Sequence, residues 1–412
     1  MVTVPTPNST GYKTIWLKPV KGAASHLVRI INDSLAEGFR TFKIKIKNGG
    51  EGLYPNICLP IAGTIEYYSS LGCQFLPSRS SSGSSYASII GLLNPYSNPL
   101  EVRQDAFLDK IWRINADTHY QVVTGTINSL RKAAVMSSGV LNALELCLNE
   151  ISDNILVHST RCEENSPSGL VMTQYHKSTG RIAISVYDQG IGIPASLKKG
   201  GIAFENTKDA ILLSMQAGVT DGKGAGNGLW LLKSIIEQGR GSLEITSDGV
   251  RYSLIHREDY SSRETFSKSL SLIGGTTLVD FQLDVSQPIE LDKVLGPNGF
   301  IDLWMEEREE DWDGTIVRLN VAKEADGLGS RIDGSSFRNL VLNVMSSAQT
   351  VILDFSSVSI VSLSFADEAI GKLIDTIGFG SFLERIKIEQ ANETCLTIIQ
   401  TIISQHPSGQ ES

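Results

Sequence analysis

The chain has 412 residues, of which 41% are hydrophobic and 20% are charged, and these values predict a folded protein of roughly two to four domains. The net charge of -9 argues against a general nucleic-acid binder, because phosphate contacts need clustered Lys and Arg. The sequence contains no signal-peptide pattern and no apolar run that approaches a membrane helix. The five cysteines are scattered outside any C-x-x-C pair, which is typical of a cytoplasmic protein.

Strand and helix patterns alternate in the first part of the chain. Residues 13–18 and 41–47 alternate apolar and polar side chains, as strands do, and residues 24–39 have apolar side chains near helical spacing. We therefore predict a small α/β domain of unknown function over residues 1–95. A mostly helical connector is expected to follow over residues 96–140.

A larger domain is predicted over residues 141–285. It opens with a long amphipathic helix and ends with strands at residues 242–246, 250–256 and 276–285. The polar residues 257–269 are expected to form a long excursion between two of these strands.

The first helix of this domain has a row of polar side chains beside its apolar stripe. Glu150, Asn154 and His158 recur every four residues, so a helix brings them to one face. A carboxylate and an amide one turn apart can hold a hydrated Mg²⁺ ion and orient a water molecule. Taken alone, such a row is more typical of a solvated helix face.

An aspartate and two glycines follow the next apolar strand. Asp188 ends this strand, and Gly190 and Gly192 come directly after it. A half-buried carboxylate can accept a hydrogen bond from the exocyclic amine of adenine, and it disfavours guanine, which has a carbonyl there. The two glycines permit positive φ and a close approach of the backbone. A strand with a tight turn is the plain alternative, since D-x-G-x-G alone is only moderately specific.

Alternating glycines lead directly into an apolar helix that is expected to begin at Leu229. Glycine amides before a helix N-terminus form an anion site, because free N–H groups and the helix dipole both favour phosphate. Lys223 adds a positive charge to this loop, and a flexible linker would not usually run straight into such a helix. The pattern is neither a P-loop nor a Rossmann fingerprint. The glycines are Gly222, Gly224, Gly226 and Gly228.

The three segments, in this order and at these spacings, resemble the N, G1 and G2 boxes of the Bergerat-fold ATPases, which include gyrase, Hsp90, histidine kinases and MutL. The resemblance implies a two-layer α/β sandwich that binds ATP and Mg²⁺. It implies that Glu150 is the general base or orients the attacking water, that Asn154 binds the metal and cofactor, and that Asp188 recognises adenine.

The resemblance also assigns the base pocket and the lid. Thr276 or Thr277 resembles the strand threonine that assists Asp188, and the sequence does not separate these two neighbours. Gly190 and Gly192 would shape the base pocket. The lid over the phosphates and its helix would involve Gly222, Lys223, Gly224, Gly226, Gly228 and Leu229.

The branch of the superfamily is indicated by what the sequence lacks. None of the six histidines has the context of a histidine-kinase phosphoacceptor, and no transducer domain like that of gyrase B or MutL is recognisable. The compact domain, with its polar row of Glu, Asn and His, most resembles the anti-sigma-factor serine kinases.

A third α/β unit is predicted over residues 315–404, between a linker at residues 286–314 and a tail at residues 405–412. Strand and helix patterns alternate here as well, and the unit resembles the STAS-like domains that occur with such ATPases.

The predicted junction between the buried strand and the next helix of this unit differs from its relatives. Related anti-anti-sigma domains have Asp-Ser-Ser-Gly at this place, whereas residues 361–365 read Val-Ser-Leu-Ser-Phe. Ser364 and Asp367 fit a capping box, and we favour this cap over a phosphorylation site.

The fold class predicted is therefore α/β (α+β), with a central Bergerat-fold sandwich flanked by small α/β domains. The predicted function is that of an ATP·Mg²⁺-binding regulatory protein, in which ATP binding or turnover controls the docking of domains or of a protein partner. Serine-kinase activity is left open. One alternative is an ATP-driven dimerising clamp in a bacterial stress or phage-defence complex, and another is a non-catalytic nucleotide-binding scaffold. A protein partner is expected, homodimerisation is left open, and neither membrane nor nucleic acid is indicated.

Overall fold

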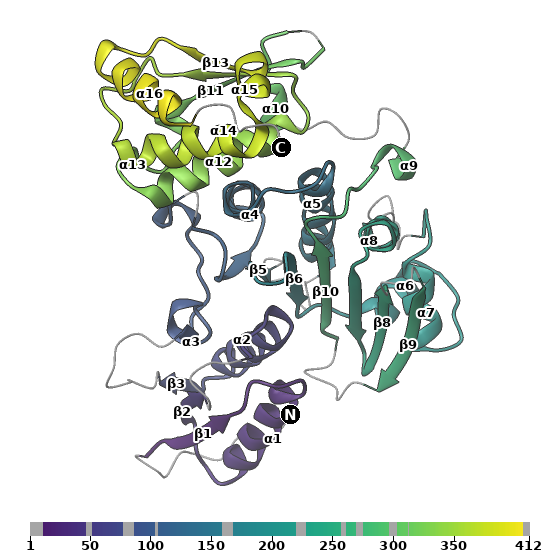
Figure 1. The fold of residues 1–412 in the computed structure, drawn as a ribbon. Helices are drawn as coiled ribbons and strands as arrows, with labels where there is room; N and C mark the ends of the chain where they lie inside the picture. Colours follow the sequence, from purple (N-terminus) through teal and green to yellow (C-terminus); the bar gives the residue numbers. More distant parts are fainter. Residues whose placement is uncertain are drawn as a thin grey trace. The chain divides into compact units, whose positions relative to one another are not determined.

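The computed structural model describes residues 11–46, 52–76, 86–103, 106–158, 168–219, 228–256, 261–268, 275–295, 303–311 and 313–406. The fold is mixed α/β, as predicted (Figure 1). The chain divides into two compact units, one formed by Met1–Thr126 with Glu145–Asp284, the other by Ile127–Leu144 with Val285–Ser412. No helix among the described residues is long and apolar enough to cross a membrane.

The first unit begins with a three-stranded parallel sheet of order β1-β2-β3, whose first two strands and first helix were predicted. Both connecting helices pack against each other and therefore lie on the same face of this sheet. Their shared core includes Leu27, Phe42 and Leu59, all fully buried. The elements are β1 (Lys13–Leu17), α1 (Ala23–Ala36), β2 (Thr41–Ile46), α2 (Pro55–Ser70) and β3 (Gln74–Leu76).

A seven-stranded antiparallel sheet of order β4-β5-β6-β10-β7-β8-β9 forms the rest of this unit. Two of its strands were not predicted, since β4 lies in the expected helical connector and β9 in the expected excursion. The strands are β4 (Ile111–Ile114), β5 (Gly169–His176), β6 (Arg181–Asp188), β7 (Ser242–Ser247), β8 (Val250–His256), β9 (Ser262–Lys268) and β10 (Thr277–Asp284). The helices are the short α3 (Tyr86–Ile89), then α4 (His119–Ala133), α5 (Val140–His158), α6 (Ile193–Lys199), α7 (Thr207–Ser214) and α8 (Gly228–Gln238). The end of α4 and the start of α5 belong to the second unit, which includes Ile127–Leu144.

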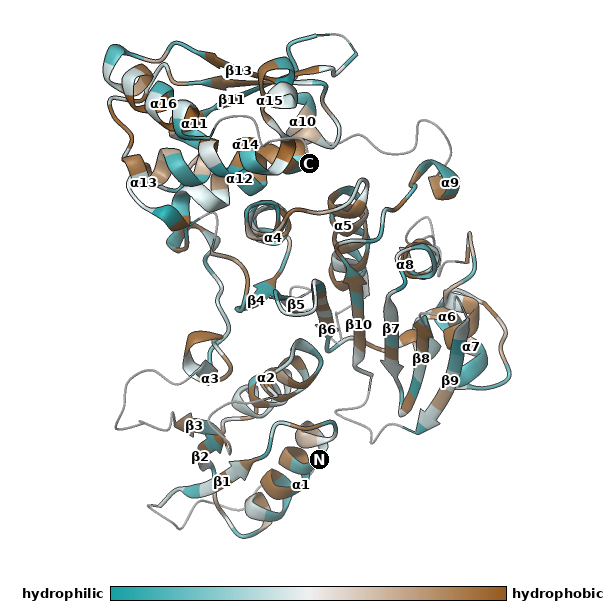
Figure 2. Cartoon of the chain, viewed as in Figure 1, coloured by the Kyte–Doolittle hydropathy of each residue, from teal (hydrophilic) through white to brown (hydrophobic). Residues whose placement is uncertain are grey.

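Helix α2 packs on one face of the large sheet and joins the two sheets into one core. It contacts β5, β6 and β10, and its hydrophobic residues are brown in Figure 2. The fully buried Tyr187 of β6 belongs to the same cluster as the core of the small sheet. Gly63 permits this close approach, because a Cβ at that position would overlap the Tyr187 ring. The predicted boundary at residue 95 stays a prediction, and one hydrophobic cluster includes residues on both sides of it, such as Leu59 and Met172.

A buried carboxylate lies at this interface between α2 and the sheet. Asp280 on β10 is 4% exposed, and it accepts hydrogen bonds from Ser185 Oγ at 2.5 Å and Asn56 Nδ2 at 3.3 Å. Glu244 is its neighbour across the sheet and binds Lys21 Nζ at 2.7 Å. Burial raises the pKa of Asp280 to about 7, because the charged form loses its hydration.

The second unit contains a smaller parallel sheet of order β11-β12-β13, in which strands alternate with helices as predicted. Helices pack against this sheet around a core that includes Phe337, Leu353 and Phe365. The strands are β11 (Ile316–Asn320), β12 (Thr350–Asp354) and β13 (Ile386–Glu389). The helices are α9 (Asp292–Leu295), α10 (Leu303–Glu306), α11 (Val321–Glu324), α12 (Arg331–Met345), α13 (Leu363–Ala366), α14 (Lys372–Ile377), α15 (Phe379–Arg385) and α16 (Glu393–Gln405).

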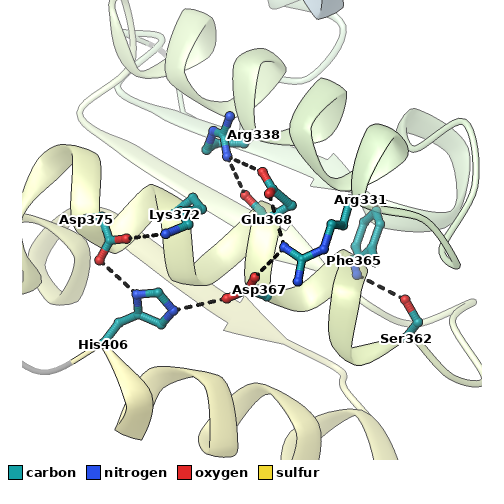
Figure 3. Close-up of polar contacts among 9 residues, drawn as sticks. All are labelled: Arg331, Arg338, Ser362, Phe365, Asp367, Glu368, Lys372, Asp375 and His406. Atoms are coloured by element: carbon teal, nitrogen blue, oxygen red, sulfur yellow. Dashed lines mark hydrogen bonds and ion pairs between the residues drawn. The ribbon is translucent and has the colours of Figure 1, made fainter.

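The predicted capping box of Ser364 and Asp367 is wrong. The helix begins two residues earlier, because Ser362 Oγ accepts a hydrogen bond from the backbone N–H of Phe365 at 3.0 Å. Asp367 instead opens a π-helical turn, η3 (Asp367–Gly371), between α13 and α14. There it binds Arg331 Nη1 at 2.9 Å and His406 Nε2 at 3.2 Å, which fastens the end of α16 to the π turn (Figure 3).

The raised pKa of Asp280 predicts that the stability of the folded protein depends on pH. The unfolded chain releases this proton near its ordinary pKa of 3.8, whereas the folded protein keeps it up to about pH 7. The free energy of unfolding should therefore fall as pH rises through this window, by up to about 1.4 kcal/mol per pH unit from this group. Urea unfolding of the parent and of Asp280→Asn across the window measures this, and the variant should have the flatter profile. Equal slopes in the two proteins would contradict the assignment.

Candidate functional site

Helix α5 brings two of the predicted site residues to the start of α8. Its buried stripe, which includes Leu148, Ile151 and Ile155, packs into the core and leaves Glu150 and Asn154 half-buried. A Cβ at Gly228 would lie 3.3 Å from Asn154 Nδ2 and 3.4 Å from Glu150 Oε2. The N box and the first residue of the G2 helix therefore adjoin. The side chain of His158 lies outside the described residues.

The environment of Glu150 suits a group that exchanges a proton. Partial burial raises the pKa of its carboxyl group, and the nearby carboxylate of Asp153 raises it further. Asp153 itself is exposed and faces His119, with Nε2 and Oδ1 at 3.5 Å. A carboxylate whose pKa lies above its ordinary value is a better general base near neutral pH.

Strand pairing brings Asp188 into line with two hydroxyl residues. Asp188 on β6 is directly opposite Thr277 on β10, and Thr277 is directly opposite Ser247 on β7. Residues paired in this way project to the same face of a sheet. Thr276 precedes the strand and is almost fully buried, so of the two candidate threonines Thr277 is the one in register with Asp188.

Ser247 is a candidate site residue that the sequence analysis did not include. It is fully buried, and its Oγ accepts a hydrogen bond from the backbone N–H of Ile193 at 3.0 Å. The predicted strand ended one residue earlier, at residue 246, and a serine at a strand end has no distinctive pattern. Only the register across β6, β10 and β7 connects it to Asp188.

The turn after Asp188 is shaped by glycines. Asp188 Oδ1 accepts a hydrogen bond from the backbone N–H of Gly190 at 2.7 Å. Gly192 has φ +81° and ψ 159°, a conformation that only glycine adopts readily, whereas Gly190 is outside the positive-φ region that was predicted for both. Gly275 has φ +81°, and a Cβ there would lie 2.6 Å from the carbonyl oxygen of Gly190.

Of the residues predicted for the lid and its helix, Gly228 and Leu229 lie within the described ranges. Gly222, Lys223, Gly224 and Gly226 lie outside the described residues. Helix α8 begins at Gly228, one residue before the predicted start at Leu229, and it ends at Gln238. Within the described ranges, no group of three or more His, Cys, Asp and Glu side chains is arranged to hold a metal ion.

Two segments of the chain match known families. Residues 139–287 match the histidine kinase-, DNA gyrase B- and HSP90-like ATPases, and residues 333–395 match a STAS-like domain of unknown function. The chain therefore contains an ATPase-type domain of this superfamily followed by a STAS-like domain. Both identifications made from the sequence are confirmed, and with them the Bergerat fold of the central domain.

The similarity to individual proteins is much weaker. The ATP-binding domain of topoisomerase IV of Francisella tularensis, solved in complex with a small-molecule inhibitor, is 15% identical with a TM-score of 0.23. The match covers 45% of this chain and 46% of that chain, and carries no argument about function. No curated protein matches the chain.

Gly192 should tolerate alanine less well than another glycine of similar φ. Gly201 has φ +77° with open space around it, so Gly201→Ala should cost only the strain of a left-handed backbone, about 1 kcal/mol. A Cβ at Gly192 would lie 3.2 Å from Ser247 Oγ, and Gly192→Ala should cost about 2–3 kcal/mol, because it also disturbs the Ser247–Ile193 bond. Urea unfolding measures both variants, and equal losses would contradict this account.

Proposed function

We propose that the chain is an ATP·Mg²⁺-binding regulatory protein, in which nucleotide binding or turnover controls the docking of the STAS-like domain or of a protein partner. The observation that carries the proposal is the row of Asp188, Thr277 and Ser247 within an ATPase-type domain. Glu150 and Asn154 beside the first residue of α8 supply the second half of the site.

The row at the strand ends suits an adenine base. The carboxylate of Asp188 would accept a hydrogen bond from the exocyclic amine, and the Thr277 hydroxyl would donate to a ring nitrogen or hold a water there. Guanine would bring a carbonyl against the same carboxylate, and the unpaired groups would penalise it. Gly192 and Gly275, which have no side chains, let the turn after Asp188 and the start of β10 approach each other closely beside this row.

The side chains beside α8 suit the phosphates and their metal. The N-terminus of α8 favours negative charge through its dipole and free N–H groups. Asn154 would hold Mg²⁺ through its amide oxygen, and the bound ion would neutralise charge on the phosphates. Glu150 would orient a water molecule or a hydroxyl group and accept its proton, for which its raised pKa is suited.

A contact within the second unit offers a route from this site to the STAS-like domain. Asn343 on α12 is 6% exposed, and its Nδ2 donates to the carbonyl oxygens of Arg131 at 2.7 Å and Ala134 at 2.8 Å. Its Oδ1 accepts from the backbone N–H of Met136 at 2.8 Å. One buried amide thus holds three backbone groups at the end of α4 and in the turn that leads to α5.

Two further contacts hold the end of α4. Asn339 Nδ2 donates to the carbonyl oxygen of Lys132 at 3.0 Å, and Lys132 Nζ pairs with Asp326 at 2.5 Å. Both charged side chains of this ion pair are largely buried. The turn continues into α5, the helix that carries Glu150 and Asn154. A shift of α5 on nucleotide binding would therefore act directly on the contacts with α12.

Nucleotide binding is testable with a matched pair of threonine variants. Mg·ATP should raise the melting temperature of the parent, and Asp188→Asn should abolish this shift because the acceptor for the adenine amine is weakened. Thr277→Val should weaken binding about tenfold through the loss of one hydrogen bond. Thr276→Val is the control and should bind as the parent does. A parent that Mg·ATP does not stabilise would rule out the proposal.

Whether the protein hydrolyses ATP or transfers its phosphate is tested separately, by incubating the protein with labelled ATP. Glu150→Gln should bind Mg·ATP as the parent does and lose turnover. Label released as phosphate identifies an ATPase, whereas label on the protein or on an added partner identifies a kinase. The Ser362 hydroxyl already caps α13 and donates to the carbonyl oxygen of Gly329 at 2.9 Å, and phosphorylation there would remove the proton of the donated bond. Binding without either product would support the non-catalytic scaffold.

The hydrogen bonds of Asn343 should transmit the effect of nucleotide binding from α5 to α12. Asn343→Ala leaves three buried backbone groups without partners, so the amide protons of the α4–α5 turn should exchange faster. The free energy of local opening that protects these protons should fall by about 2–3 kcal/mol. Nucleotide should then no longer change hydrogen exchange in α12, although ATP affinity persists. Asn339→Ala removes a single bond and is the milder control. An unchanged response of α12 in Asn343→Ala would exclude this route.

A further inference from the structure

The small sheet β1-β2-β3 has one face that no described element covers. The strands follow one another in sequence order, so both crossovers place their helices on one side (Figure 1). Ile15 and Phe42 point to that side and are buried. Parallel sheets are usually covered on both faces. Here Trp16 on the opposite face is 52% exposed and Tyr12 is 53% exposed.

Lysine side chains lie across this face beside the two aromatic rings. Trp16 is paired in register with Lys45, whose Nζ is 4.6 Å from the centroid of the Trp16 ring. Lys43 is paired with Thr14, and its Nζ is 5.6 Å from the Tyr12 ring. The uncovered face is therefore a surface of exposed rings with positive charges above them.

The charge of this part of the chain is opposite to that of the whole. Residues 11–76 contain eight Lys and Arg and four Asp and Glu, although the complete chain has a net charge of -9. The strands β1, β2 and β3 contain no acidic residue. The negative net charge of the whole chain, which argued against nucleic-acid binding, therefore does not describe this face.

The other three-stranded sheet shows that this pattern is not a consequence of the architecture. On β11, Arg318 is bonded to Glu310 and to Glu389, so its positive charge is neutralised within the protein. Lys43 and Lys45 have aromatic neighbours in place of carboxylates. Their charge remains available to an anion from solvent.

We propose that this face, formed by Tyr12, Thr14, Trp16, Lys43 and Lys45, binds single-stranded nucleic acid. Exposed rings on a flat sheet offer stacking platforms to bases, and every base has a π face, so binding would tolerate many sequences. The lysines would pair with backbone phosphates and release counterions. An acidic peptide would use the charges but not the rings. A membrane surface favours aromatic residues on amphipathic helices, whereas these rings lie on a sheet against lysine side chains.

The test is fluorescence anisotropy of labelled oligo(U) and oligo(dT), about 12 nucleotides long, with the full chain at increasing salt. Trp16→Ala should weaken binding about tenfold, and Trp16→Phe should retain most of it, because the stacking surface persists. Lys43→Gln and Lys45→Gln should each lower the slope of log affinity against log salt by about 0.7. A preference between the two oligonucleotides would separate RNA from DNA.

Two variants away from this face serve as controls. Tyr54 is 52% exposed, and Lys387 is an exposed residue of β13, so Tyr54→Ala and Lys387→Gln remove a similar ring and a similar charge elsewhere. Both should bind as the parent does. The proposal is overturned by a parent that binds neither oligonucleotide at low salt, or by binding that Trp16→Ala and Lys45→Gln leave unchanged. Trp16-dependent binding to a polyglutamate peptide or to phosphatidylserine vesicles, without oligonucleotide binding, also overturns it.

Discussion

The antiparallel pairing of β6 with β10 is the constraint on which both faces of the large sheet depend. This register sets Asp188 opposite Thr277 and, three residues further along, Ser185 opposite Asp280. Because side chains alternate along a strand, the first pair faces the candidate nucleotide site and the second faces α2. A slip of one residue would exchange the two faces, so that Asp280 would enter the nucleotide site and Asp188 would meet the apolar surface of α2. The buried bond between Ser185 and Asp280 therefore helps to hold the register that the site requires.

Helix α5 links the site to the rest of the chain in a different way. Its buried stripe fixes the rotation of the helix about its axis, and this rotation directs Glu150 and Asn154 towards the start of α8. The other end of α5 follows the turn that Asn343 holds through three backbone hydrogen bonds. These bonds involve a side chain on one partner and main chain on the other. The side chains of the turn do not take part in these bonds. The contact therefore depends on the identity of the α12 residue, Asn343, and not on the side chains of the turn.

Sequence patterns were sufficient where local chemistry decides the structure, and insufficient where pairing decides it. The three motifs pointed to Glu150, Asn154 and Asp188 as candidate site residues, because each lies in a segment with a strong helical or strand period. Strand β4 has only four residues and β9 is polar at almost every position, so only their pairing with β5 and β8 makes them strands. Ser247 and the choice of Thr277 likewise depend on which strands are neighbours, and the chain order β6, β7, β10 does not reveal that β10 lies between the other two.

The two small parallel sheets show how far fold alone informs function. Both wind in sequence order and bury one face under helices, so the same topological rule leaves both with an outer face to be accounted for. On the C-terminal sheet Arg318 is neutralised by two carboxylates, whereas on the N-terminal sheet Lys45 lies over an exposed ring. Neutralised charges have little to offer a ligand, and lysines beside exposed rings have both charge and apolar area to offer. The difference between the two sheets therefore lies in a few outward side chains, and it is these that suit one of them to binding.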